Sequence, residues 1–112
     1  MTGIPFQTIN WDHLPQTEHK GDSGTSLWKT VQFDGLRIRQ VVYSKGYFAN
    51  HWCRKGHIVY CLEGEFTSEL DNGESFLLTK GMTYVVSDDL SSHRSSTETG
   101  VTLLIVDGDF LK

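Results

Sequence analysis

The chain has 112 residues, a hydrophobic share of 38% and a net charge of −4 at pH 7. This length fits one domain with one core. The net charge argues against a nucleic-acid partner, which would need a basic stripe, and we expect the scattered basic side chains to be solvated: Arg37, Arg39, Lys45, Arg54 and Lys55. No apolar run approaches the roughly 20 residues of a membrane helix, and no secretory signal is visible, so we expect a cytoplasmic protein without a membrane contact.

The first 26 residues are expected to form an irregular arm. Pro5, Pro15, Gly21 and Gly24 interrupt any regular element there. We therefore expect residues 1–26 to lie over the rest of the chain or over a partner, and residues 27–112 to form a single domain.

Two strands are predicted next, at residues 27–33 and 36–43. Asp34-Gly35 between them is a strong signal for a hairpin turn. The second segment alternates as a half-buried strand does, with Arg37 and Arg39 on the face opposite to that of the other set: Leu36, Ile38, Gln40 and Val42.

Short strands continue to the end of the chain. They are predicted at residues 49–53, 57–63, 66–70, 74–78, 82–86 and 101–106, with turn residues such as Asp71-Asn72-Gly73, Gly81 and Gly100 between them. Strands separated by turns about every eight to twelve positions favour an all-β sandwich or barrel.

The segment 57–63 is apolar on both faces. We expect one face to carry His57, Val59, Cys61 and Glu63, and the other to carry Ile58, Tyr60 and Leu62. A strand that is apolar on both faces is covered on both faces. The outer cover is either a second copy of the chain, in a homodimer, or the arm through Ile4, Phe6, Ile9 and Trp11. We favour the homodimer.

Three residues with metal-binding side chains cluster in the run NHWCRKGH. If residues 49–53 form a strand, His51 and Cys53 point the same way, and His57 opens the next strand after a turn at Gly56. Histidine nitrogen and cysteine thiolate are good ligands for zinc and related metals. The spacing does not match the paired knuckles of a zinc finger.

The stretch from Gly46 to Ser96 resembles the cupin superfamily. His51 matches the first histidine of the first cupin motif, Cys53 and His57 stand at its second histidine and its glutamate, and Gly64 falls at its last glycine. Gly81 and His93 resemble the ends of the second motif. The resemblance implies a double-stranded β-helix (jelly-roll) barrel with a metal in its mouth, held by His51, Cys53, His57 and His93.

Within the superfamily, the chain resembles small bacterial proteins with a DHCW motif, although Asn50 replaces the aspartate. The chain departs from the general cupin pattern at Gly46, Met82 and Ser87, and one residue is inserted before His93. A thiolate in place of a carboxylate preserves the ligand charge and softens the site, which favours a divalent transition metal such as zinc, iron or nickel.

Other interpretations of the same residues stay open. Cys53 and Cys61 could form a disulfide, which is less favoured in a cytoplasmic protein, and Cys53 could be a nucleophile with His57 as its base. We expect Cys61 to be a core residue, and the side chains of Glu63, Glu65 and Arg94 to be solvated. Three functions follow: a metal-dependent enzyme on a small molecule, such as a dioxygenase, isomerase or lyase; a non-enzymatic binding or sensing module; or a structural metal site.

Overall fold

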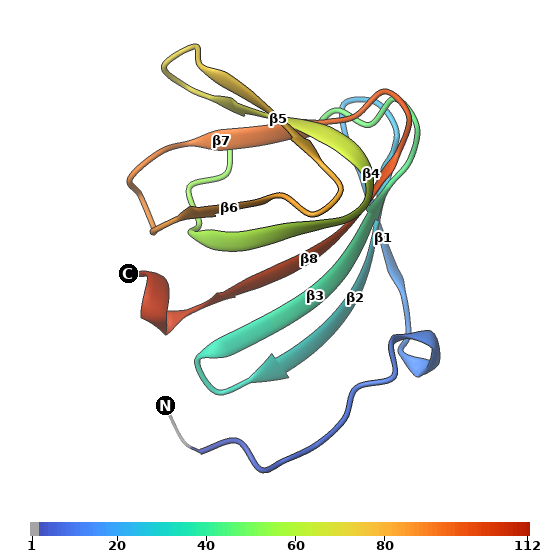
Figure 1. Ribbon diagram of the computed structural model, residues 1–112, viewed down its shortest axis with the longest axis vertical. Helices are drawn as coiled ribbons and strands as arrows, with labels where there is room; N and C mark the ends of the chain where they lie inside the picture. The colour runs from blue at the N-terminus through green and yellow to red at the C-terminus, as the bar shows by residue number, and fades with distance from the viewer. Residues whose placement is uncertain (1–2) are drawn as a thin grey trace.

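Strand β4 (His57–Leu70) connects the two sheets of the molecule (Figure 1). In the computed structural model, which describes residues 3–112, its first half lies between β8 (Val101–Gly108) and β6 (Thr83–Val86). Its second half pairs with β5 (Ser75–Thr79) and β7 (His93–Ser96). One strand thus belongs to both sheets, and the core lies between them.

The remaining strands extend the sheet on the side of β8. β3 (Leu36–Tyr43) pairs with β8, β2 (Thr25–Phe33) with β3, and β1 (Thr17–Lys20) with β2, all antiparallel. Two short 3₁₀ helices, η1 (Trp11–His13) and η2 (Asp109–Leu111), complete the described elements. The prediction of an all-β fold is confirmed. Within residues 3–112, no helix has the length and apolar character needed to cross a membrane.

The predicted strands at 57–63 and 66–70 are one continuous strand. A β-bulge between Cys61 and Glu63 shifts the register against β8, and Gly64 follows with φ +80°. Before the bulge every odd residue from His57 to Cys61 is buried, and after it Phe66 and Ser68 are buried. The bulge therefore switches the inward face from odd to even positions. For this reason, and contrary to the prediction from simple alternation, Glu63 does not share the buried face of His57, Val59 and Cys61.

The hydrophobic core fills the space between the two halves of β4. Its residues come from β3, β4, β5 and β8, and each is at most 6% exposed: Val41, Val59, Cys61, Phe66, Leu78, Val101, Leu103 and Ile105. Cys61 is fully buried and, like Cys53, is a free thiol, so Cys61 is a core residue as expected and the disulfide alternative is absent from residues 3–112.

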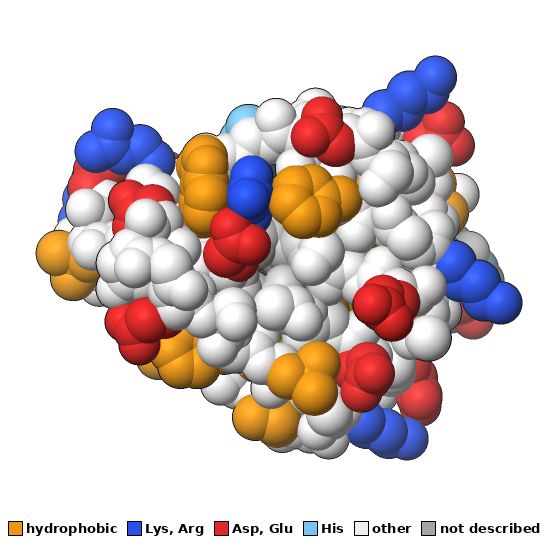
Figure 2. All heavy atoms as spheres, turned by 90° about the horizontal axis from the view of Figure 1, so that it is seen from above, with side chains coloured by type: hydrophobic (Ala, Val, Ile, Leu, Met, Phe, Trp, Pro, Cys, Tyr) orange, Lys and Arg blue, Asp and Glu red, His pale blue; other side chains and the backbone are white. Residues whose placement is uncertain are grey.

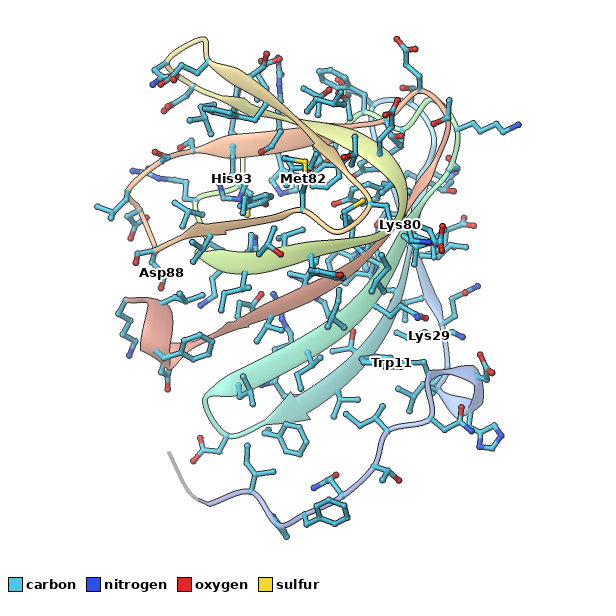
Figure 3. All side chains as sticks on the ribbon, in the orientation of Figure 1. Trp11, Lys29, Lys80, Met82, Asp88 and His93 are labelled. Carbon is cyan, nitrogen blue, oxygen red and sulfur yellow. The ribbon has the colours of Figure 1, made fainter. Side chains whose placement is uncertain are left out.

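The arm contains more regular structure than the sequence predicted. Residues 17–20 form β1 on the edge of β2, so the expectation of an arm without regular elements is wrong there. The edge of β2 offers unpaired backbone groups that any adjacent extended segment satisfies. Residues 8–12 lie beside Gln40 of β3, and Figure 3 shows Trp11 on the same side of the molecule as Lys29 of β2. Met1 and Thr2 lie outside the described residues.

Two local predictions, one of them in the run NHWCRKGH, need correction. Residues 49–53 are not a strand; Cys53 alone forms a bridge there, to His93. β7 (His93–Ser96) was not predicted, because its sequence HRSS is polar throughout. Both segments are held by pairing with distant strands, and a local hydrophobic pattern does not record such pairing.

The outer face of β4 and its neighbours carries an exposed apolar surface, which we call the outer β4 patch. It contains Ile58 and Tyr60 of β4, Val85 opposite Ile58 on β6, and Leu104 and Val106 of β8. Tyr60 is 40% exposed and Val85 is 67% exposed, so the arm does not cover the patch within one chain. Figure 2 shows another face of the molecule, on which two hydrophobic groups flank a basic and an acidic side chain and further hydrophobic side chains lie near the lower edge.

The expected homodimer stays a prediction, and the outer β4 patch is where we expect the contact. Light scattering at tens of micromolar should give twice the chain mass of 12.7 kDa. Val85→Asp should shift the protein to the monomer, because it buries a charge in the contact. Leu90→Asp, at a residue 76% exposed outside the patch, is the matched control and should remain dimeric. A monomeric full-length chain would contradict the prediction.

The bulge of β4 also makes a stability prediction. A methyl group at Gly64 would overlap the carbonyl oxygen of Gly100, and its φ of +80° disfavours any side chain. Gly73 has φ +94° but open space around it. We expect Gly73→Ala to lower the free energy of unfolding by about 1 kcal/mol, and Gly64→Ala by about 3 kcal/mol. Urea unfolding followed by fluorescence measures both, and equal losses would show that the overlap is relieved without cost.

Candidate metal centre

Three metal-binding side chains meet at one end of the space between the sheets. The Sγ of Cys53 and one ring nitrogen each of His57 and His93 all lie within 4.8 Å of one another. The Sγ of Cys53 is 3.4 Å from the Nε2 of His57. Both histidines are buried, at 7% and 3% exposure, and Figure 3 shows His93 within the space bounded by β6 and β7.

Backbone pairing explains why residues distant in sequence converge. The N–H of Cys53 donates to the carbonyl of His93 at 2.7 Å, and the N–H of His93 donates back at 3.0 Å. His93 is paired on its other side with Leu70, at the end of β4, while His57 is at the beginning of β4. The long bent strand and the loop before it therefore bring the three donors to one place.

A hydrogen bond of His93 determines which of its ring nitrogens is free to bind a metal. The Nδ1 of His93 is 3.1 Å from the carbonyl oxygen of Ser91, which only accepts, so this Nδ1 carries the proton. The Nε2 of His93 then presents a lone pair, and it is buried without a partner within residues 3–112. A buried nitrogen without a partner is costly, and a metal ion would satisfy it. The three donors fit a transition metal.

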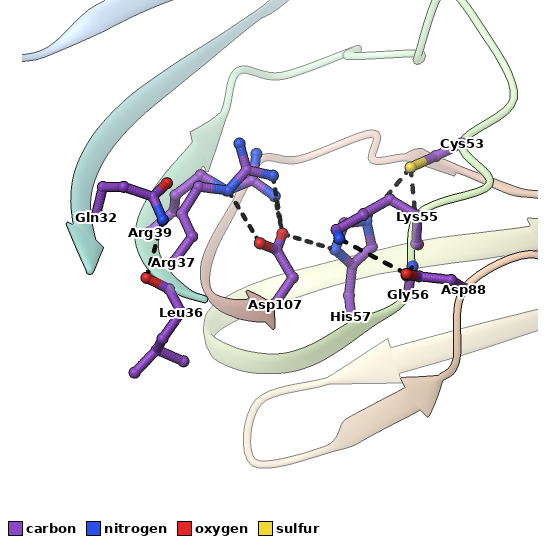
Figure 4. Close-up of polar contacts among 10 residues, drawn as sticks. All are labelled: Gln32, Leu36, Arg37, Arg39, Cys53, Lys55, Gly56, His57, Asp88 and Asp107. Carbon is purple, nitrogen blue, oxygen red and sulfur yellow. Dashed lines mark hydrogen bonds and ion pairs between the residues drawn. The ribbon is translucent and has the colours of Figure 1, made fainter. Parts of the chain in front are cut away.

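Asp107 lies behind His57 and orients it. Its Oδ2 is 3.2 Å from the Nδ1 of His57, which leaves the Nε2 of His57 toward Cys53 (Figure 4). A carboxylate on the far nitrogen of a ligand histidine fixes its ring and raises its basicity as a ligand. The contacts from Asp107 to His57 and from His57 to Cys53 therefore hold these two metal-binding side chains in a fixed orientation.

Two arginines of β3 neutralise this buried carboxylate. Arg37 binds Asp107 in a two-pronged contact, with Nε at 3.0 Å from Oδ1 and Nη2 at 2.9 Å from Oδ2, and Arg39 donates to Oδ2 at 3.1 Å. Burial raises the pKa of Asp107, but the hydrogen bonds and charge of Arg37, with Arg39 and His57, outweigh it and hold the pKa below 3.8. Asp107 is therefore ionised at neutral pH.

The arginines correct the predicted faces of β3. Arg39 is 5% exposed, Val41 is buried, and Val42 is 37% exposed, so the face that carries Arg37 and Arg39 points inward. The expectation of a solvated side chain is wrong for Arg39, while Arg37, with its side chain 30% exposed, is partly solvated. Period-two alternation identifies two faces but assigns the apolar one to the core by default, and here a buried carboxylate on the next strand reverses the assignment.

The thiol of Cys53 is biased toward its ionised form. Burial raises its pKa, but the hydrogen bond and charge of His57, the carbonyl of Lys55 and the charge of Arg39 together lower it below 9.0. A thiolate is both the metal-binding and the nucleophilic form of cysteine.

His51 lies outside the group of three. It is exposed, its Nδ1 is 2.6 Å from the side-chain oxygen of Asn50, and it lines the same cavity without joining the donors. Its prediction as a ligand depended on a strand at residues 49–53, which would have placed it beside Cys53. The chain turns there instead, between the bridges of Phe48 and Cys53.

Sequence reasoning missed Asp107, although the pattern held a signal. Val101, Leu103 and Ile105 alternate along β8 and are all buried, and Asp107 is the next residue on that face. A charged residue that continues a buried alternating face is a candidate for a paired internal charge. The predicted strand ended at residue 106, one residue too early.

The other single residues are placed as follows. The guanidinium carbon of Arg94 lies 4.7 Å from the ring centre of Phe48 and 4.3 Å from that of Trp52. The Nη2 of Arg94 donates to the Oε1 of Glu69 at 2.7 Å. Arg94 therefore connects the loop before β4 to β7. Its side chain is 29% exposed, so it is only partly solvated. Glu63 and Glu65 are exposed as expected, and Glu63 pairs with Lys80 at 3.0 Å.

A cavity of about 200 Å³ opens beside the three donors. Its walls include Trp28, Val41 and Leu103 from the core side, and Arg39, Cys53 and His57 from the polar side. Three protein donors leave further coordination positions of a metal open, and the cavity provides space for a small molecule next to them.

Solved structures show which fold this is. The chain superposes with an RmlC-like cupin from Shewanella frigidimarina at a TM-score of 0.71 and 21% identity, covering 93% of this chain and 91% of that one. With a predicted oxalate decarboxylase from Thermotoga maritima, the TM-score is 0.78 and the identity is 12%, covering 91% of this chain and 98% of that one. With ectoine synthase from P. lautus, the TM-score is 0.68 and the identity is 19%, covering 92% of this chain and 78% of that one.

No family model matches the sequence, and no curated protein matches it. Identities at this level show the fold alone. The predicted cupin fold is confirmed, and the resemblance to the DHCW subgroup stays a prediction.

The site makes a prediction about its buried carboxylate. Asp107→Asn leaves Arg37 and Arg39 without their counter-charge, so we expect the free energy of unfolding to fall by about 3 kcal/mol. Asp109→Asn is the matched control, because Asp109 is exposed and pairs with Lys112 at 3.7 Å; we expect a change within about 0.5 kcal/mol. Urea unfolding measures both. A loss at Asp107 no larger than that at Asp109 would contradict the role of this charge.

Proposed function

We propose that this chain is a metal-binding cupin in which Cys53, His57 and His93 hold one divalent transition metal, and in which the adjacent cavity takes a small molecule. One observation supports this most: the buried Nε2 of His93 has no partner within the described residues, and the donor atoms of the three residues lie within 4.8 Å of one another. A site built only for stability would not leave this nitrogen unpaired.

The donor set narrows the class of metal. One soft thiolate and two neutral imidazoles of borderline softness favour zinc, iron or nickel over magnesium or manganese. When bound, the metal would supply a Lewis acid or a site for a small ligand. The chain's own part is to orient His57 through Asp107, to lower the pKa of the Cys53 thiol, and to supply the apolar walls of the cavity.

The fold alone does not indicate a reaction. The similar structures include a predicted oxalate decarboxylase and an ectoine synthase, whose names describe different chemistries. We keep the three predicted functions, with an enzyme or a sensing module ahead of a purely structural site, because three protein donors leave open positions. The cytoplasmic location and the fourth ligand, His51, stay predictions.

A second function is favoured by one specific arrangement. Cys53, His57 and Asp107 form a continuous chain of contacts at 3.4 and 3.2 Å, which is the order of nucleophile, base and orienting carboxylate in cysteine enzymes. The sequence alone gave no orienting partner. In a metal-free chain this arrangement would support nucleophilic catalysis by Cys53.

Metal analysis tests the proposed function. Protein purified without a histidine tag should contain one metal per chain by plasma mass spectrometry. Cys53→Ser and His93→Ala each remove one donor, and we expect either change to weaken metal binding at least about tenfold. His13→Ala and Cys61→Ala are the matched controls, since they change the same residue types outside the group, and both should keep the metal.

Two results would contradict the proposal. Full metal content in both donor variants would show that the metal is held elsewhere. A metal-free wild-type chain, in which iodoacetamide modifies Cys53 much faster than Cys61 and Asp107→Asn slows that modification, would favour the nucleophile.

A further inference from the structure

The cavity beside the metal group is lined by basic side chains and by no acidic one among residues 3–112. Arg37, Arg39, Lys55 and Arg94 contribute to its walls. This composition is unexpected in a chain with a net charge of −4. Lys55 and Arg94 are paired with Asp88 and Glu69 outside the cavity, so an anion is favoured mainly beside Arg39.

Arg39 is the basic residue with the most unused binding capacity. Its side chain is 6% exposed, and within the described residues its only hydrogen bond runs from Nη2 to Asp107. Its Nε is buried without a partner. A guanidinium carries several N–H donors in a planar fork that matches a carboxylate. Because Nε is closed to solvent and Nη2 binds Asp107, the donors left for a ligand are those of Nη1 and the second N–H of Nη2.

Asp107 does not use up the charge of Arg39. Arg37 already binds both oxygens of Asp107, and His57 donates to the same carboxylate (Figure 4). Two guanidinium groups therefore face one carboxylate. A Cys53 thiolate would balance the second positive charge in a metal-free chain, whereas with a divalent metal bound the cavity would keep a net positive charge. Burial lowers the pKa of Arg39, which reflects the cost of keeping this charge away from water.

The size and walls of the cavity limit the anion. The volume of about 200 Å³ is somewhat larger than the roughly 150 Å³ that accommodates benzene in an engineered protein cavity. The ring of Trp28 lies 4.5 Å from the guanidinium carbon of Arg39, and Val41, Leu103 and Ile105 continue the apolar wall. One free guanidinium against apolar walls suits a monoanion with an apolar body better than inorganic phosphate.

We propose that the cavity binds a small organic carboxylate, with the carboxylate on the fork of Arg39 and the apolar body against Val41, Leu103 and Ile105. This inference rests on the proposed function, because it names the class of small molecule that the metal-binding cavity takes. Arg39 and His57 bind the same oxygen of Asp107, so the carboxylate end of the ligand lies next to the metal donors.

Calorimetric titration with benzoate and benzamide tests the proposal. The two probes have nearly the same shape and differ in charge. The full-length protein carrying its metal should bind benzoate about 10- to 100-fold more tightly than benzamide, the range expected for hydrogen bonds to a charged group. Equal affinities, or tighter binding of inorganic phosphate than of benzoate, would overturn the proposal.

Two variants locate the contact. Arg39→Met should abolish the preference for benzoate, whereas Lys55→Met removes the same charge at a side chain 42% exposed and should keep the preference. If Arg39→Met binds metal and still prefers benzoate, the carboxylate sits on the metal and the assignment to Arg39 is wrong. If Arg39→Met does not fold, NMR of the wild-type protein replaces this variant. Benzoate should shift the Arg39 Nε–H resonance and benzamide should not. Equal shifts with both probes would overturn the assignment.

Metal content measured on each sample separates the two proposals. A chain that binds one metal but shows no preference for benzoate retains the proposed function and loses this inference. A chain without metal that prefers benzoate through Arg39 retains the carboxylate site and loses the metal centre.

Discussion

The carboxylate of Asp107, 2% exposed, is the point on which the functional end of this molecule depends. It accepts hydrogen bonds from Arg37 and Arg39 of β3 and from His57 of β4, so one side chain of β8 joins three adjacent strands. An ionised carboxylate in a protein interior is tolerated only when it is paired and hydrogen-bonded, and an arginine turned inward has the same requirement. The two kinds of charge therefore require each other, and the strands that carry them are fixed in register.

From this anchor the geometry of the site follows in a few steps. Asp107 holds the Nδ1 of His57, so the Nε2 of His57 faces Cys53. The backbone pair between Cys53 and His93 brings the third donor into the same space. β4 makes this arrangement reachable, because it begins at His57 in one sheet and ends beside His93 in the other, with a bulge at the bend.

The cavity has metal-binding donors on one side and an anion-binding side chain on the other. On one side are soft donors suited to a transition metal, and on the other is a buried guanidinium with free N–H groups. Arg39 and His57 share one oxygen of Asp107, so a change at either side is transmitted to the other through a single carboxylate. A ligand that binds Arg39 would therefore also affect the orientation of a metal-ligand histidine.

The sequence by itself determined the all-β class, the hairpin at Asp34-Gly35 and two of the clustered metal-binding residues, Cys53 and His57, because turn chemistry and short-range spacing are local properties. His93 was identified only through the family resemblance. Tertiary structure alone decided that His51 lies outside the group, since the bridge of Cys53 to β7 replaces the strand that local pattern favoured. It also decided that the arginine face of β3 is the inner one. Periodicity measures the alternation of a strand but not which side is buried, and only the approach of Asp107 from β8 makes burial of a charged face favourable.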